Sequence, residues 1–237
     1  MNKHYLEILG KIKKNAGKKK TQHQEFGKKY LGTNKIYYCI SIGNIKKIAK
    51  DFLQKHENLS FDDYLSLLNS LYEKGKSTDE LMTAAKIVEL SNKLRKQLEP
   101  KVLDNWLSYV EGWAEVDVLC QSNFKAEEIL ANWDKWKKLI LNFSKDENVH
   151  KRRASLVLLT MSSRNTTDKR LADLAFANIE KLKGEKDILI TKAISWLLRS
   201  LIKNHKKEVK TYLEKNKKTL PSIAVRETTR KLLTGKK

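Results

Sequence analysis

Hydrophobic residues recur at intervals of three and four positions along most of this chain, which is the spacing of one face of an α-helix. The clearest case lies at 44–54, where the apolar positions are Ile45, Ile48, Ala49 and Phe52. These four side chains share one face when the segment is helical. We therefore predict a helix over 44–54 that begins near Asn44 and buries this face.

The amino-terminal segment 3–16 has a basic amphipathic pattern, with lysines on one side of the predicted helix. Its apolar residues are Tyr5, Leu6, Leu9 and Ile12, which we predict to form the buried face. The basic stretch 17–21 interrupts the pattern and predicts a turn that offers a possible phosphate contact. A second short helix is expected over 22–31, where Gly32 would end it.

The same periodicity continues to the end of the chain, with turns marked by glycine and proline. It predicts further helices over 60–74, 77–99, 100–110, 124–143, 147–161, 167–182, 185–204, 206–217 and 221–233. The segment 36–42 alone resembles a strand. It has no candidate partner strand nearby, so we interpret it as an extended connection.

Composition supports an almost entirely helical fold, because the 237 residues include only 9 glycines and 2 prolines. Hydrophobic residues make up 40% of the chain, enough for a sizeable core. The length fits one large domain or two small ones. We expect a single all-helical domain over 1–237, in which residues 1–24 form a loosely attached basic helix and turn.

A basic residue followed by small and apolar residues recurs in the second half of the chain. Arg153 lies 39 residues before Lys192, and Arg226 lies 34 residues after Lys192. This period is typical of antiparallel helix pairs stacked as HEAT-like repeats, which form a superhelix with a concave face. The three basic residues would then line a basic groove. Alternatively, each merely ends its own helix.

The formal net charge of +21, from 49 Lys and Arg against 28 Asp and Glu, indicates a polyanionic partner. Nucleic acid is the leading candidate and an anionic membrane surface the second. The alternative is a solvated surface rich in lysine.

Several functional classes have no support in the sequence. It contains no dinucleotide-binding or phosphate-binding glycine loop, no nucleophile elbow and no metal-ligand spacing among its five histidines. We therefore expect neither metal nor cofactor. Two distant cysteines and the lack of a long apolar run favour a cytoplasmic protein outside the membrane.

Trp113 and Asp117 are candidate site residues because they are four positions apart, so a helix would place them on one face. An aromatic ring beside a carboxylate suits a cation or a cation-like transition state. The alternative is that Trp113 belongs to the core and Asp117 is a solvated polar residue.

Four motifs in this chain resemble those of the DNA alkylation-repair glycosylases built from HEAT-like repeats, the AlkD type. They are Cys39-Ile40-Ser41-Ile42-Gly43-Asn44-Ile45-Lys46, Trp113-Ala114-Glu115-Val116-Asp117, Lys151-Arg152-Arg153-Ala154 and Lys192-Ala193-Ile194-Ser195-Trp196-Leu197-Leu198-Arg199. The first motif departs from the family pattern, because Cys39 replaces the usual glycine, Ile42-Gly43 replaces Thr-Pro and Lys46 replaces arginine.

The resemblance implies that Asp117 is the catalytic carboxylate and that Arg153 is its basic companion on the DNA backbone. It implies that Trp113 and Trp196 form aromatic walls around the lesion. The residues expected to bind the DNA backbone are Lys46, Arg152, Lys192 and Arg226.

By the same resemblance, the expected reaction removes cationic N-alkylated purines, chiefly 3-methyladenine and 7-methylguanine, from double-stranded DNA. The enzyme would act as a monomer and associate with the nucleoid when bound to DNA. Two alternatives are a non-catalytic HEAT-repeat protein that binds damaged or branched DNA, and a protein–protein scaffold. In the scaffold, the site residues would be plain packing residues.

Overall fold

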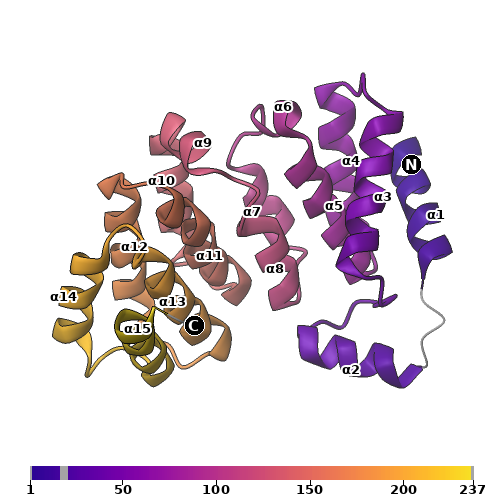
Figure 1. The fold of residues 1–237 in the computed structure, drawn as a ribbon. Helices are drawn as coiled ribbons and strands as arrows, with labels where there is room; N and C mark the ends of the chain where they lie inside the picture. The colour runs from indigo at the N-terminus through magenta and orange to yellow at the C-terminus, as the bar shows by residue number, and fades with distance from the viewer. Residues whose placement is uncertain (1, 17–20, 236–237) are drawn as a thin grey trace. The chain divides into compact units, whose positions relative to one another are not determined.

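The computed structural model describes residues 2–16 and 21–235, and within them every regular element is an α-helix (Figure 1). The helices are α1 (Lys3–Asn15), α2 (Thr21–Leu31), α3 (Ile42–Lys55), α4 (Phe61–Glu73), α5 (Thr78–Leu90), α6 (Asn92–Arg95), α7 (Val102–Leu107), α8 (Trp113–Cys120), α9 (Ala126–Ala131), α10 (Trp133–Phe143), α11 (Val149–Asn165), α12 (Lys169–Leu182), α13 (Ile188–Leu201), α14 (Lys206–Asn216) and α15 (Ser222–Thr234). The all-helical prediction is confirmed. The predicted basic turn over 17–21 falls largely outside the described residues.

The chain divides into two compact units, Met1–Leu119 and Cys120–Lys237. We call them the amino-terminal unit and the carboxy-terminal unit. Each has its own buried core, and each is described separately below. The single domain expected over 1–237 stays a prediction.

In the amino-terminal unit, α3 packs along α5, and α1 contacts α3, α4 and α5. Tyr5, Ile8 and Ile12 of α1 are buried, with Ile8 and Ile12 fully inaccessible to solvent. The expectation that the first 24 residues are loosely attached is therefore wrong for α1. The predicted buried face was also misplaced, because Leu6 is 46% exposed and Ile8 takes its place in the core.

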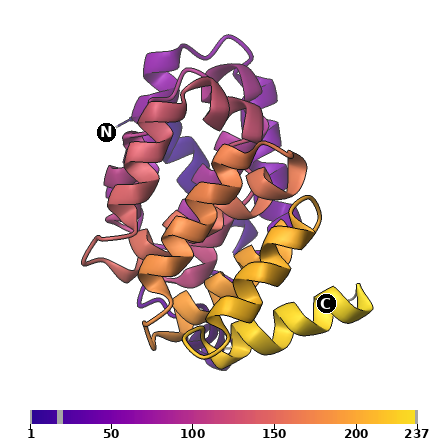
Figure 2. The same ribbon diagram turned by 90° about the vertical axis from the view of Figure 1, so that its left-hand side faces the viewer.

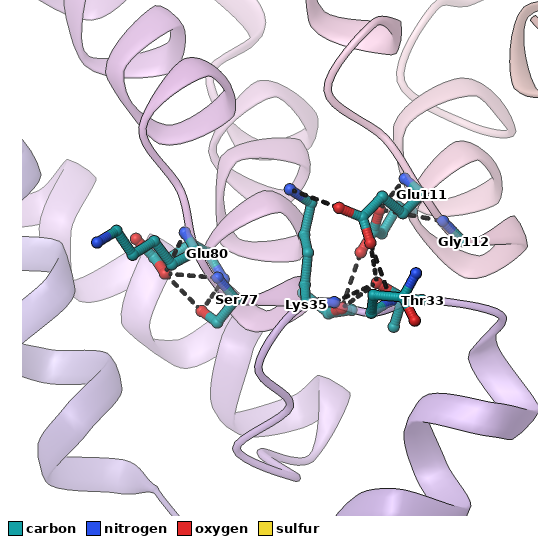
Figure 3. Close-up of polar contacts among 10 residues, drawn as sticks. Thr33, Lys35, Ser77, Glu80, Glu111 and Gly112 are labelled. Atoms are coloured by element: carbon teal, nitrogen blue, oxygen red, sulfur yellow. Dashed lines mark hydrogen bonds and ion pairs between the residues drawn. The ribbon is translucent and has the colours of Figure 1, made fainter.

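Two buried carboxylates in the first turn of α5 hold other segments of the amino-terminal unit. Glu80 accepts a hydrogen bond from the backbone N–H of Ser77 at 2.9 Å and thereby caps α5 (Figure 3). It also accepts from the Tyr5 hydroxyl at 3.0 Å, which fastens α1. Asp79 accepts from the backbone N–H groups of Tyr38 (2.7 Å) and Ile40 (3.1 Å). Residues 36–41 thus form the connection that we expected, although Cys39 within it has a left-handed φ of 58° and Ile42 already belongs to α3. Its one isolated bridge pairs Ile36 with Ser77.

The helix predicted over 77–99 is interrupted after Leu90, where α5 ends and the short α6 begins. The Ser91 hydroxyl lies 2.7 Å from the Ile87 carbonyl oxygen, and Nη1 of Arg95 donates to the Glu89 carbonyl at 3.0 Å. The Arg95 guanidinium thus satisfies a carbonyl group that the end of a helix leaves without a partner. The Ile87 carbonyl accepts from the backbone N–H of Ser91 as well, at 3.1 Å. No glycine or proline marks this break, which explains why the hydrophobic pattern did not reveal it.

A second predicted helix, over 124–143, is likewise divided into α9 and α10. Asn132 separates them with φ −120° and ψ 43°, outside the helical range. The remaining predicted helices are present with boundaries shifted by a few residues.

The carboxy-terminal unit consists of helix pairs arranged in two layers. Helices α11, α13 and α15 contact one another in succession, and α12 and α14 pack between these neighbours on the other side (Figures 1 and 2). Arg153, Lys192 and Arg226 fall on α11, α13 and α15 respectively. The predicted period therefore corresponds to successive helices of one layer, as in HEAT-like repeats.

We predict that Asp79→Ala lowers the free energy of unfolding by about 2–4 kcal/mol, because it leaves two backbone N–H groups without their acceptor. Asp62→Ala is the matched control, since Asp62 occupies the same position in the first turn of α4 but is exposed. Urea unfolding followed by circular dichroism measures both. Equal losses in the two variants would show that Asp79 adds nothing beyond a charge at a helix end.

Candidate functional site

Trp113 and Asp117 lie one turn apart on α8, as their spacing predicts, and both side chains are half-buried. The indole Nε1 of Trp113 donates a hydrogen bond to the Tyr30 carbonyl oxygen at 2.8 Å. The Tyr30 ring meets the indole edge-on, with centroids 5.5 Å apart and planes at 85°. The end of α2 therefore fixes the orientation of the Trp113 ring.

Glu115, between these two residues, anchors the amino end of α8. Its carboxylate is 3% exposed and accepts from the backbone N–H of Glu111 (2.9 Å), that of Gly112 (3.3 Å) and the hydroxyl of Thr78 (2.8 Å). Backbone N–H groups at a helix start have no partner within the helix, so a side-chain acceptor stabilises them. This role could not be recognised from the sequence, because a glutamate in the first turn of a helix is usually solvated.

The start of α8 is also joined to the loop that follows α2. Glu111 accepts from the backbone N–H of Asn34 at 2.9 Å, and its other oxygen lies 3.6 Å from Nζ of Lys35 (Figure 3). A Cβ atom at Gly112 would lie 2.6 Å from the Leu31 carbonyl oxygen, so this close approach requires glycine. Together these contacts hold the helix that carries Trp113 and Asp117.

Burial raises the pKa of Glu115, although hydrogen bonds from Glu111, Thr78 and Gly112 and the charge of Lys35 act in the opposite direction. The net effect favours the protonated form in the folded state. The ordinary pKa of a glutamate side chain, by comparison, is 4.5.

The carboxy-terminal unit contains a cationic pocket of about 540 Å³ between α11, α13 and α15. Its lining residues are Arg153, Lys192, Trp196, Arg199, Ile223, Glu227 and Arg230. Four of these side chains are cationic and one is a carboxylate, which gives a formal charge of +3. Lys192, Trp196 and Arg199 follow one another at helical spacing, so they lie along one side of α13.

Hydrogen bonds fix several side chains of the cationic pocket. Glu227 accepts from the Ser195 hydroxyl at 2.6 Å and lies 3.2 Å from Nη2 of Arg199, so the carboxylate ties α15 to α13. Arg153 is 5% exposed, and its Nη1 donates to the Leu189 carbonyl at 2.6 Å. The half-buried Trp196 presents part of its ring to the pocket.

Two of the four residues predicted to be catalytic or lesion-contacting, Arg153 and Trp196, thus share one pocket. The other two, Trp113 and Asp117, share α8 in the amino-terminal unit.

The residues predicted to bind the DNA backbone have different surroundings. Lys192 is exposed and lines the cationic pocket. Lys46 is exposed and lies 3.1 Å from Glu89. Arg152 binds Glu185 through Nε at 2.8 Å and Nη2 at 3.3 Å, and also donates to two backbone carbonyls. Arg152 therefore links α11 to the loop before α13, and its charge is already paired with a carboxylate.

Arg226 is exposed but does not line the cationic pocket, whereas Arg230, one turn later, does. Neither Arg199 nor Arg230 was predicted as a site residue from the sequence. The spacing of Ile223, Glu227 and Arg230, which places them on one side of α15, was the sequence signal that could have identified Arg230.

Among the described residues, no helix is long and apolar enough to span a membrane.

Comparison with known proteins relates the chain to one family. The model of a family described as DNA alkylation repair enzyme matches residues 12–232. Among solved structures, the chain is similar to "Predicted DNA alkylation repair enzyme from Enterococcus faecalis", with 19% identity and a TM-score of 0.71. The alignment covers 91% of this chain and 97% of that one, and at this identity it shows a common fold. No curated protein matches the chain.

We predict that Glu115→Gln leaves the free energy of unfolding at pH 7 within about 1 kcal/mol of wild type, because the amide can keep all three hydrogen bonds once the Thr78 hydroxyl rotates. Glu115→Ala should lose about 2–4 kcal/mol, because it leaves backbone N–H groups without an acceptor. Urea unfolding measures both variants.

The pH dependence follows from the raised pKa. Below pH 4.5 Glu115 is protonated in both states. Above pH 4.5, Glu115 loses its proton in the unfolded state before it does so in the folded state, because its pKa is raised in the folded state. The wild-type protein therefore loses stability relative to Glu115→Gln as the pH rises. Glu127→Gln, at an exposed first-turn position of α9, is measured alongside as the matched control substitution. A constant difference between wild type and Glu115→Gln from pH 4 to pH 7 would contradict the prediction.

Proposed function

Because the chain belongs to the DNA alkylation repair enzyme family, we propose that it excises cationic N-alkylated purines, chiefly 3-methyladenine and 7-methylguanine, from double-stranded DNA by hydrolysing the N-glycosidic bond. The observation that carries this proposal is the cationic pocket, in which an indole ring is surrounded by side chains suited to phosphate. The carboxylate of Asp117 supplies the chemistry.

The cationic pocket suits the backbone and sugar of a damaged nucleotide. Lys192 and Arg230 are exposed, so each can contact a phosphate without giving up a buried partner. Trp196 lies between cations and can pack against a deoxyribose or a base, and its ring attracts positive charge. Arg153 is held at the Leu189 carbonyl, which fixes the guanidinium group that we assign to a phosphate near the lesion.

Asp117 is the residue to which we assign catalysis. In the proposed reaction, the bond between C1′ and the purine nitrogen breaks, and its electron pair neutralises the positively charged base. The base is therefore a good leaving group that needs no general acid. A water molecule adds to C1′, and its proton passes to Asp117 or to solvent. The ionised carboxylate stabilises the positive charge that develops on the sugar.

Trp113 complements this role from the same side of α8. Its indole N–H is already engaged by Tyr30, so the face of the ring is what it can offer a cationic sugar or base. Water is the only co-substrate of the proposed reaction, which draws on no metal or cofactor. We propose that the protein acts as a monomer.

We predict that Asp117→Asn lowers the rate of base release at least 100-fold, because an amide cannot offset the positive charge that develops on the sugar. DNA affinity should change less than about threefold, since the contacts assigned to phosphate remain. The measurement is chromatography of bases freed from methylated duplex DNA under single-turnover conditions, together with a DNA-binding titration. Asp134→Asn, at an exposed position of α10, makes the same charge change as a control.

The outcomes separate the alternatives. Full activity of Asp117→Asn would exclude this mechanism. Tight DNA binding by wild type without base release would identify a non-catalytic DNA-binding protein. No DNA affinity at physiological salt would favour a protein–protein scaffold.

We also predict that Arg230→Ala weakens DNA binding and lowers the slope of log affinity against log salt by about 0.9, the value for one phosphate contact. Arg170→Ala removes the same charge outside the cationic pocket, at a residue paired with Asp168, and should leave the slope unchanged. Fluorescence anisotropy at several salt concentrations measures both. Arg226→Ala in the same series decides between these two positions on α15. Equal slopes for Arg230→Ala and wild type would remove Arg230 from the interface.

A further inference from the structure

A cluster of side chains with metal-ligand chemistry lies in the amino-terminal unit, apart from the residues assigned to the proposed reaction. His4, Glu7 and His56 each bring one ligand atom to within 4.8 Å of the others. His4 and Glu7 share one side of α1 because they are three residues apart. His56 directly follows the last residue of α3. The sequence showed no metal-ligand spacing because His56 is supplied by a distant segment.

Packing holds the two imidazole rings in place. The rings of His4 and His56 have centroids 4.6 Å apart and planes at 77°. Phe52 of α3 contacts both, with centroids 4.6 Å from His56 and 5.6 Å from His4. The backbone N–H of His56 donates to the Phe52 carbonyl oxygen at 3.1 Å. Neither ring therefore needs a large rearrangement to act as a ligand.

His4 borders a space next to the cluster. The residue is 5% exposed, and its backbone N–H donates to the Asn2 side chain at 2.9 Å. Its ring lines a pocket of about 430 Å³ that is also lined by His56 and Asp63. The imidazole therefore adjoins a space that can hold an ion and its water.

The carboxylate of Glu7 completes the set. One oxygen lies 2.9 Å from Nε2 of His56, and the other lies 3.2 Å from Nζ of Lys55 and 3.4 Å from Nζ of Lys11. A carboxylate oxygen is a ligand that Zn²⁺ binds alongside imidazole nitrogen atoms.

Two features oppose metal binding, and both are small. The ammonium groups of Lys55 and Lys11 repel a cation, but Lys55 is 63% exposed and can turn toward solvent. The ligand atoms are also farther apart than in a closed site. Atoms bound to one zinc ion at about 2.0–2.2 Å lie roughly 3.3–3.6 Å from one another. Side-chain movements of about 1 Å close that gap.

We propose that His4, Glu7 and His56 bind a divalent transition-metal ion of the Zn²⁺ class. Two imidazoles and a carboxylate form a ligand set that Zn²⁺ favours, and a water molecule in the pocket completes a tetrahedral site. The ion fastens the amino end of α1 to the carboxyl end of α3, so it stabilises the folded chain by mass action. The metal site is independent of the proposed base excision.

The test uses the full chain without an affinity tag, stripped with a chelator, and Zn²⁺ alone as the probe. Calorimetry at pH 7.5 should give one ion per chain with a Kd of about 10 µM or lower, and thermal unfolding should shift upward in saturating Zn²⁺. Co²⁺ in place of Zn²⁺ should give the strong visible absorption of a tetrahedral site. His4→Gln and His56→Gln should each weaken binding at least tenfold and abolish the thermal shift.

His23→Gln is the matched control, because it removes one exposed imidazole from α2 and should leave both readouts unchanged. Circular dichroism shows whether each variant is folded. If His4→Gln does not fold, Glu7→Gln and the Co²⁺ spectrum of wild type decide. The proposal is overturned by the absence of a saturable single site in wild type, or by equal Zn²⁺ affinity of His4→Gln and His23→Gln.

Discussion

The amino-terminal unit depends on carboxylates that are buried at the amino ends of helices and accept hydrogen bonds from backbone N–H groups. Glu80 caps α5 and receives the hydroxyl of Tyr5, and Asp79 holds the segment 38–40. Glu115 does the same for α8 and reaches Thr78 in the first turn of α5. Removing these charges from water is costly, and the hydrogen bonds offset only part of that cost, because burial raises the pKa of both Asp79 and Glu115. The helix that carries Trp113 and Asp117 is thereby joined to α5.

In the carboxy-terminal unit, the cationic pocket is formed by side chains that recur at helical spacing, and not by buried carboxylates. Side chains at helical spacing on α13 and α15 face each other across the cationic pocket, and Arg153 enters from α11. Glu227 neutralises part of this charge and binds both Ser195 and Arg199. The remaining cations keep an attraction for a polyanion, while their stems and Trp196 provide apolar surface.

Much of this organisation was predictable from the sequence, because helical periodicity and a repeat of basic residues are local patterns. The helix over 44–54, the shared turn of Trp113 and Asp117, and the placement of Arg153 and Lys192 on successive layer helices all followed from spacing. The break at Ser91 did not, since side-chain hydrogen bonds end α5 there without glycine or proline.

Residues whose surroundings come from distant segments were the hardest to interpret from the sequence. Arg152 has the same sequence context as Arg153 but is bound by Glu185. Leu6 resembled a core residue, yet the helices that α1 contacts cover Ile8 instead. His4 and His56 looked scattered because they are more than fifty residues apart. In each case the residue that determines these surroundings belongs to a distant segment of the chain, and local spacing carries no information about such contacts.

The backbone at Cys39 has a consequence for local motion. Its φ of 58° lies in the left-handed region, which costs roughly 1–2 kcal/mol for a residue with a side chain. The backbone N–H groups of its neighbours Tyr38 and Ile40 both donate to Asp79, so these hydrogen bonds hold the strained residue in place. When those hydrogen bonds open, relief of strain favours the open form. The exchange of these amide hydrogens and the accessibility of the Cys39 thiol should therefore report on one cooperative opening, faster than global unfolding.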